Sequence, residues 1–154
     1  MRSIAILDAG PLLASLDRRD PDHVRSAEVL RRRDLDLIVP ALVIAEVSHF
    51  AALRLGPRGE AVFVRGLRDL NVEAPDPDDW PTIADLVERY GDLPLGTVDA
   101  SIVVLADRLD TDLIVTLDRR HFGTIRSPRG RSFRLLPEPT QVHEDPSDYS
   151  PPPA

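Results

Sequence analysis

Four acidic residues lie at positions where their carboxylates can converge in the folded chain. Asp8 directly follows the apolar run IAIL, and Asp118 follows the apolar run LIVTL. Glu46 and Asp99 lie inside segments whose apolar residues recur at helical spacing. Open parallel sheets bind ligands at the carboxyl ends of their strands, so we expect the two strand-end acids to meet there. This set of carboxylates predicts a site for a hard divalent cation, Mg²⁺ or Mn²⁺.

The two acids in helical segments share their faces with apolar side chains. These apolar neighbours are Leu42, Val43, Phe50 and Leu53 for Glu46, and Ile102, Val103 and Ala106 for Asp99. Burying an unpaired carboxylate is costly. The chain contains no lysine to pair with either acid, because all 19 basic residues are arginine. A divalent cation would satisfy all four carboxylates.

The four acids are assigned roles in a catalytic metal site. Asp8 and Asp99 are expected to be the principal metal ligands. Glu46 and Asp118 are expected to complete the ligand shell, directly or through water, and to orient the nucleophile. Two such ions, roughly 4 Å apart, would activate a water molecule and stabilise the leaving oxygen of a phosphodiester. Which acid binds which ion stays open at this point.

Each of these acids also has a structural interpretation. Asp8 and Asp118 can cap the helices that follow them. Asp99 can lie in the first turn of its helix because the helix dipole favours a negative charge there. Glu46 can pair with an arginine. Four such coincidences at strand ends and on helix faces are less probable together than singly, which favours the metal site.

The residues around Asp118 are candidates for contact with a nucleic-acid substrate. Thr116 can hydrogen-bond a carboxylate or a scissile phosphate, or can be an ordinary strand threonine. Arg119 and Arg120 adjoin Asp118 and are the best candidates for phosphate contact. They open a basic segment without acids, which we expect beside the site, the alternative being a solvated loop; its arginines are Arg119, Arg120, Arg126, Arg129, Arg131 and Arg134. The acids expected to face water nearby are Asp107, Asp110 and Asp112.

The elements that must position these residues alternate between strand and helix. Strands are predicted at 3–8, 35–39, 71–74, 113–117 and 132–136, and helices from about residue 10 and at 21–33, 40–55, 58–70, 78–90 and 97–109. This alternation predicts an α/β fold with a mostly parallel sheet. Residues 137–154 contain six prolines and several acids, and are predicted to be a disordered or loosely draped tail.

Composition limits the class of protein. A length of 154 residues suits one domain, and the absence of cysteine excludes disulfides, thiolate zinc sites and cysteine nucleophiles. A cytoplasmic location is expected. No stretch approaches the roughly 20 apolar residues of a membrane span, and Asp8 interrupts the N-terminal apolar run in a way that a secretion signal would not tolerate. The net charge of −7 opposes a broad basic groove but permits a local nucleic-acid site.

The four acidic stretches resemble the motifs of the PIN domain, and more closely those of the VapC-type toxins of VapBC toxin–antitoxin modules. The matching stretches, in order, are ILDAGPLLA, VIAEV, GTVDASIVVLADRL and TLDRRHF, which contain Asp8, Glu46, Asp99 and Asp118. The order and spacing match over residues 1–136, which are taken as the domain. The resemblance implies a three-layer α/β/α fold, Mg²⁺ or Mn²⁺, and endonucleolytic cleavage of RNA. It also implies a homodimer and a VapB-like antitoxin that occludes the active site.

Other functions fit the sequence less well. Hydrolases with an aspartyl nucleophile need a second acid where this chain has Gly10, and they need a lysine, as do two-component receiver domains. No GxxxxGK[ST], GxGxxG or HExxH motif is present. His121 lies close to Asp118 and is interpreted as structural or as weakly facing phosphate. The alternative from a different class is a non-catalytic PIN-like module that binds RNA or a protein.

Overall fold

The strands and helices of the computed structural model, which describes residues 1–139, follow the predicted alternation. The strands are β1 (Ser3–Leu7), β2 (Leu35–Pro40), β3 (Asn71–Glu73), β4 (Leu113–Val115) and β5 (Arg134–Leu136). The helices are α1 (Ala9–Leu16), α2 (His23–Leu30), α3 (Ala41–Gly66), the 3₁₀ helix η1 (Leu67–Asp69), α4 (Asp79–Arg89), α5 (Thr97–Arg108) and α6 (Arg119–Thr124). The predicted tail lies outside the described residues from residue 140 onward.

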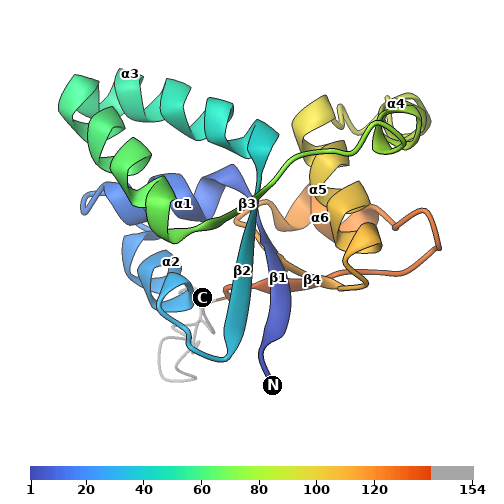
Figure 1. Ribbon diagram of the computed structural model, residues 1–154, viewed down its shortest axis with the longest axis horizontal. Helices are drawn as coiled ribbons and strands as arrows, with labels where there is room; N and C mark the ends of the chain where they lie inside the picture. Colours follow the sequence, from blue (N-terminus) through green and yellow to red (C-terminus); the bar gives the residue numbers. More distant parts are fainter. Residues whose placement is uncertain (140–154) are drawn as a thin grey trace, which may run out of the picture.

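The sheet has the strand order β3-β2-β1-β4-β5, and each of its pairings is parallel. Helices α1, α2 and α3 lie on one side of it and α4 and α5 on the other (Figure 1). The predicted three-layer α/β/α fold with a parallel sheet is therefore confirmed. The chain starts at the central strand β1, builds outward to β3, and then returns to add β4 and β5 on the other side of β1. The carboxyl ends of β1 and β4 thus flank the point where the strand order reverses, which is where open α/β sheets bind ligands.

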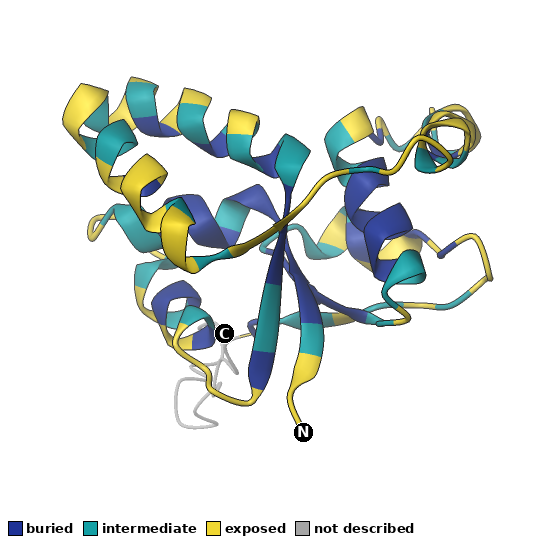
Figure 2. Ribbon diagram, viewed as in Figure 1, coloured by how far each residue is buried: buried dark blue, intermediate teal, exposed yellow. Residues whose placement is uncertain are grey.

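The central strands are buried because helices cover both faces of the sheet. Ile6 and Leu7 of β1 and Ile114 and Val115 of β4 are fully buried, as Figure 2 shows for these strands. Continuous apolar runs of this kind are typical of parallel strands in α/β proteins. Burial of each such side chain contributes roughly 1.5–3 kcal/mol. The carboxyl ends of the central strands, which carry Asp8 and Asp118, are therefore supported by a rigid core.

Helix α3 is interrupted where the sequence predicted a boundary between two helices. Gly56 has a φ of 69°, a left-handed conformation that favours glycine, and Pro57 follows it. The break separates a first half, which begins directly after β2 and carries Glu46, from a second half that ends at Gly66. None of the described helices combines the length and apolar character that a membrane crossing requires.

The predicted core face of α3 is partly wrong. Phe50 and Leu53, which were expected to line the core with Glu46, are 37% and 69% exposed. The buried stripe consists instead of Val43, Val47 and Ala51. These residues follow one another at intervals of four, so a neighbouring stripe of the same helix faces the core. Glu46 consequently lies at the edge of the packed face rather than within it.

The short helix α6 was not predicted as an element. It spans Arg119–Thr124, and Asp118 is its N-cap residue. Six residues are too few for apolar periodicity to reveal a helix. The available sequence signal was Asp118 itself, because aspartate is among the preferred N-cap residues. The first part of the basic segment is therefore helical, rather than the loop that was the alternative to a substrate contact.

Candidate active site

Asp8 lies at the carboxyl end of β1 and is 8% exposed. Its Oδ1 accepts a hydrogen bond from the main-chain nitrogen of Ala9 at 2.7 Å, so Asp8 caps α1 as the structural interpretation allowed. Its Oδ2 accepts a hydrogen bond from the Thr116 hydroxyl at 2.7 Å. Burial raises the pKa of Asp8 above its ordinary value, against the opposing effect of these hydrogen bonds, and the negative charge of Asp118 raises it further.

Thr116 links the two strand-end acids. Its side chain is 1% exposed, and its hydroxyl donates to Asp8 and accepts a hydrogen bond from the main-chain nitrogen of Asp118 at 2.9 Å. This arrangement follows from the sheet register, in which Leu7 pairs with Val115. The next residues of the two strands, Asp8 and Thr116, are thereby brought side by side. Thr116 contacts a carboxylate, which is one of the two functional roles expected for it.

Asp118 begins α6 and points one carboxylate oxygen at each donor of His121. Its Oδ1 accepts a hydrogen bond from the main-chain nitrogen of His121 at 3.0 Å, and its Oδ2 lies 2.6 Å from the imidazole Nδ1. The Asp118 side chain remains 41% exposed. Sequence reasoning undervalued His121, although its position three residues after an N-cap aspartate is a signal that the two side chains can meet.

Asp99 lies in the first turn of α5, which packs against β1 and α3. Burial raises the pKa of Asp99 to about 6, and the negative charges of Asp8, Glu46 and Asp118 contribute to this rise. The nearby His121 opposes it. Each of the other three predicted acids therefore acts electrostatically on Asp99. The negative charges of the four acids therefore interact near the carboxyl ends of the central strands.

Glu46 lies in the second turn of α3 and is half-buried. Burial raises its pKa above the ordinary value, and the negative charge of Asp8 adds to the effect. The alternative in which Glu46 pairs with an arginine is not met, since no ion pair to Glu46 forms within residues 1–139. Glu46 is thus a carboxylate held close to other carboxylates without a compensating charge.

The donor set fits a hard divalent cation in its chemistry. Asp8, Glu46 and Asp99 share negative charge at one edge, and in the described part of the chain none of them forms an ion pair with a basic side chain. Within residues 1–139, however, no three Asp, Glu or His side chains already lie close enough to form a ready-made ligand group. Repulsion between carboxylates opposes such an approach until a cation neutralises them. Cation binding would therefore require these side chains to move closer together.

The raised pKa of Asp99 predicts how the metal-free protein responds to pH. An acid with a folded-state pKa of about 6 and an ordinary value of 3.8 destabilises the fold fully above pH 6. This penalty disappears as the pH falls from 6 towards 4, because the folded state then binds the proton more readily than the unfolded state. Because Asp99 is partly exposed, solvent screening keeps this difference below roughly 3 kcal/mol.

The test of this pH dependence is urea unfolding in EDTA at pH 7.5, 6 and 5. The free energy of unfolding should increase more on acidification for the natural chain than for Asp99→Asn, which cannot titrate at this position. Equal increases for the two proteins would show that Asp99 is not destabilised by its surroundings.

The two arginines next to Asp118 differ in their surroundings. The Arg119 guanidinium donates to the main-chain oxygens of Leu135 and Pro137 at 3.1 and 2.9 Å, which ties α6 to the end of β5. Arg120 is exposed, and within the described residues its side chain makes no ion pair. The geometry therefore favours Arg120 over Arg119 as the residue that is free to contact a phosphate.

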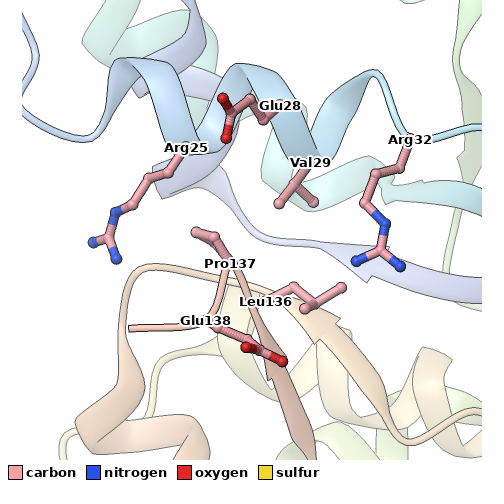
Figure 3. A pocket seen from close by; sticks show the side chains of 7 residues that line it. All are labelled: Arg25, Glu28, Val29, Arg32, Leu136, Pro137 and Glu138. Atoms are coloured by element: carbon pink, nitrogen blue, oxygen red, sulfur yellow. The ribbon is translucent and has the colours of Figure 1, made fainter. Parts of the chain in front are cut away.

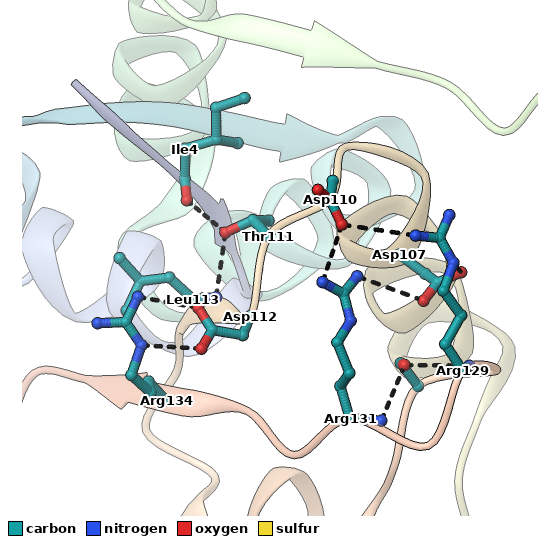
Figure 4. Close-up of polar contacts among 10 residues, drawn as sticks. Ile4, Asp107, Asp110, Thr111, Asp112, Leu113, Arg129, Arg131 and Arg134 are labelled. Atoms are coloured by element: carbon teal, nitrogen blue, oxygen red, sulfur yellow. Dashed lines mark hydrogen bonds and ion pairs between the residues drawn. The ribbon is translucent and has the colours of Figure 1, made fainter. Parts of the chain in front are cut away.

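The three arginines at the end of the basic segment do not flank the acids. Arg129 and Arg131 form ion pairs with Asp107 and Asp110 (Figure 4). A further pair joins Arg134 to Asp112, with two contacts of 2.9 Å. The expectation that these aspartates face water is wrong for Asp107, whose side chain is 14% exposed, whereas Asp110 pairs with arginine while remaining 75% exposed. The physical reason is topological. The aspartates precede β4, so their pairs form at the amino ends of the strands, whereas the strand-end acids lie at the carboxyl ends.

A separate cavity of about 300 Å³ lies between α2 and the end of β5 (Figure 3). Its lining includes Arg25 and Arg32 together with Glu28 and Glu138. The two arginines already pair with Asp22 and Asp34, respectively. None of the four predicted acids lines this cavity, so it is not part of the predicted site.

Comparison with known proteins places these features in a family context. The family described as PIN domain matches residues 5–126. Ribonuclease VapC26 of Mycobacterium tuberculosis is 36% identical over 134 residues, which cover 86% of this chain and 99% of the relative. The crystal structure of the sarcin-ricin loop cleaving toxin VapC20 of the same organism is similar, with a TM-score of 0.66 and 16% identity over 73% of this chain and 87% of that one. DNA-bound VapBC of Salmonella typhimurium gives a TM-score of 0.63 at 20% identity, over 88% and 98% of the two chains.

Proposed function

Because this chain belongs to the PIN domain family and, within it, to the VapC-type proteins, we propose that it is a metal-dependent endoribonuclease that acts as the toxin of a type II toxin–antitoxin pair. The observation that carries this proposal is the environment of Asp99. Its carboxylate lies among three others, with a pKa raised to about 6. A binding module that only holds RNA has no use for converging negative charge beside a polyanion, whereas a hydrolase that recruits a cation does.

The ligand assignment follows from burial and position. Asp8 and Asp99 are the most suitable principal ligands for Mg²⁺ or Mn²⁺, and Glu46 and Asp118 would complete the shell directly or through water. When bound, such an ion supplies Lewis-acid stabilisation of charge on phosphodiester oxygens and activates water as a nucleophile. Asp99 must lose its proton before it can ligate, and a pKa of about 6 leaves it mostly ionised at neutral pH.

The other residues of the site orient these carboxylates and the substrate. The Thr116 hydroxyl directs Oδ2 of Asp8 and fixes the main chain of Asp118 through two hydrogen bonds. Asp118 is half-exposed and can accept a proton from a water molecule that approaches the phosphodiester. Arg120 is free to contact an RNA phosphate. Arg119 is a weaker candidate for that contact, because its guanidinium already donates to main-chain oxygens.

Partners and location are proposed on the same family relationship. We propose a VapB-like antitoxin that covers the acidic edge, a homodimeric assembly, and a cytoplasmic location where RNA is available. The solved relatives that share this fold include a toxin–antitoxin complex from Klebsiella pneumoniae, with a TM-score of 0.59 at 20% identity over 79% of this chain and 92% of that one. We also propose that residues 1–136 form the catalytic domain.

The proposal is tested with purified protein and an end-labelled mixture of cellular RNAs. Cleavage is expected with Mg²⁺ or Mn²⁺, should stop in EDTA, and should be lost in Glu46→Gln. Glu88→Gln is the matched control, because Glu88 is an exposed glutamate of α4 outside the acidic edge. Retention of RNA without new ends would favour the non-catalytic binding module. Equal cleavage by Glu46→Gln and the natural chain would contradict the assigned site.

A further inference from the structure

His121 contacts Asp118 through two different donors. Its main-chain nitrogen lies 3.0 Å from Oδ1 of Asp118, and its imidazole Nδ1 lies 2.6 Å from Oδ2. A carboxylate accepts hydrogen bonds on both oxygens, so the imidazole must carry its hydrogen on Nδ1 for this contact. Both oxygens of Asp118 are therefore oriented by one residue, and each keeps a lone pair for a further partner.

The position of His121 is itself well defined. Asp118 is the N-cap of α6, and the third residue of a helix points its main-chain N–H back at the cap. The next residue, Phe122, is fully buried and anchors α6 in the core. The main-chain nitrogen of Asp118 is held in turn by Thr116. The imidazole thus approaches a carboxylate whose backbone is already fixed, so that the remaining freedom is the rotation of the carboxylate group.

That rotation matters because Asp118 is more solvent-accessible than Asp8, the other hydrogen-bonded acid of the site. Its side chain is 41% exposed, whereas Asp8 is 8% exposed and is held by its own pair of hydrogen bonds. Without a partner on Oδ2, the Asp118 carboxylate would sample several orientations in water. The His121 side chain is 26% exposed and shields one side of it.

We propose that His121 is a positioning residue that acts through Asp118: its imidazole holds the carboxylate in the orientation needed to complete the cation site and to orient the attacking water. This inference rests on the function proposed above. Hydrogen-bonded partners that orient metal-ligating side chains typically change metal affinity or activity by about 10–100-fold when they are removed. The competing explanation is that the contact only caps α6, in which case its loss would affect stability alone.

Two substitutions separate these explanations. His121→Phe keeps a ring of similar shape and removes the Nδ1 donor. His121→Asn places an amide nitrogen close to the position of Nδ1 and restores a donor. His49→Phe is the matched control, because His49 is exposed on α3 and makes no carboxylate contact within the described residues.

The primary measurement is the dissociation constant of Mn²⁺, obtained by calorimetry on the RNA-free protein, with thermal unfolding as a check on folding. We expect His121→Phe to weaken Mn²⁺ binding by about 10-fold or more, His121→Asn to recover most of the loss, and His49→Phe to bind like the natural chain. In RNA cleavage, kcat should fall more than KM rises. Unchanged Mn²⁺ affinity in a folded His121→Phe protein would overturn the inference and leave helix capping as the explanation.

A double-mutant cycle shows whether His121 acts through Asp118. If it does, Asp118→Asn combined with His121→Phe should bind Mn²⁺ no more weakly than Asp118→Asn alone. Additive losses would overturn this route. The cycle also separates the two levels of interpretation: if Asp118→Asn impairs Mn²⁺ binding and cleavage but His121→Phe does not, only the role of His121 fails. If the natural chain neither binds Mn²⁺ nor cleaves RNA, the proposed function itself fails.

Discussion

Asp99→Asn is expected to lower the rate of RNA cleavage by about 10³-fold or more while the protein remains folded. The substitution keeps the shape of the side chain and removes the negative charge that we assign to cation binding. Metal ions in hydrolases contribute several kcal/mol of charge stabilisation in the transition state, and each 1.4 kcal/mol or so corresponds to a factor of ten in rate. The negative charges of the other three acids all act on Asp99. Removing its carboxylate should therefore impair cation binding by the whole site.

The measurement is a single-turnover cleavage assay on the RNA that the natural chain cleaves fastest in the mixture of cellular RNAs. Asp85→Asn is the matched control, because it makes the same chemical change at an exposed aspartate of α4 that lies away from the four acids. Circular dichroism checks that Asp99→Asn is folded. A rate within threefold of the natural chain, with nuclease contamination excluded, would show that Asp99 has no catalytic role.

Mn²⁺ is expected to stabilise the natural chain strongly and to leave Asp99→Asn almost unaffected. A ligand that binds only the folded state raises the free energy of unfolding by about 2.7 kcal/mol at 100 times its dissociation constant. For a domain of this size, that corresponds to an increase in Tm of about 5–10 °C. The binding energy includes relief of the repulsion among Asp8, Glu46 and Asp99, which the metal-free protein must tolerate.

The natural chain and Asp99→Asn should therefore exchange their order of thermal stability when Mn²⁺ is added. In EDTA at pH 7.5, Asp99→Asn is expected to be the more stable, because it lacks one of the mutually repelling charges. In saturating Mn²⁺, the natural chain should be the more stable. Thermal unfolding with a Mn²⁺ titration measures both, and Asp85→Asn should follow the natural chain. The absence of any Mn²⁺ shift in the natural chain would favour a PIN-like module without a metal site.

The strand-end acids were the part of the site that sequence could predict best. Asp8 and Asp118 each end an apolar run, and a buried parallel strand explains both the run and its abrupt polar end. What the runs could not show was that β1 and β4 are neighbours. Their pairing, with Leu7 opposite Val115, is decided by the order in which the strands assemble. It alone brings Thr116 to the Asp8 carboxylate.

The arginines show the opposite case, in which local sequence was misleading. Six arginines follow Asp118 within sixteen residues, and proximity along the chain suggested proximity to the site. Arg129, Arg131 and Arg134 instead pair with acids at the other edge of the sheet. The chain crosses the length of the sheet between Asp118 and the start of β5, so neighbours in sequence end at opposite edges. Arg120, which is exposed and forms no ion pair within the described residues, stays the candidate for substrate contact.

Local pattern and composition were sufficient for the alternation of strands and helices and for the break at Gly56, because backbone propensity and apolar periodicity act over a few residues. The face of α3 that is buried, the His121 contact and the mutual repulsion around Asp99 depend on which elements pack together. Packing is a property of residues distant in sequence, and electrostatic shifts follow burial. The burial, the contacts and the pKa shifts of these residues were therefore decided by tertiary structure alone.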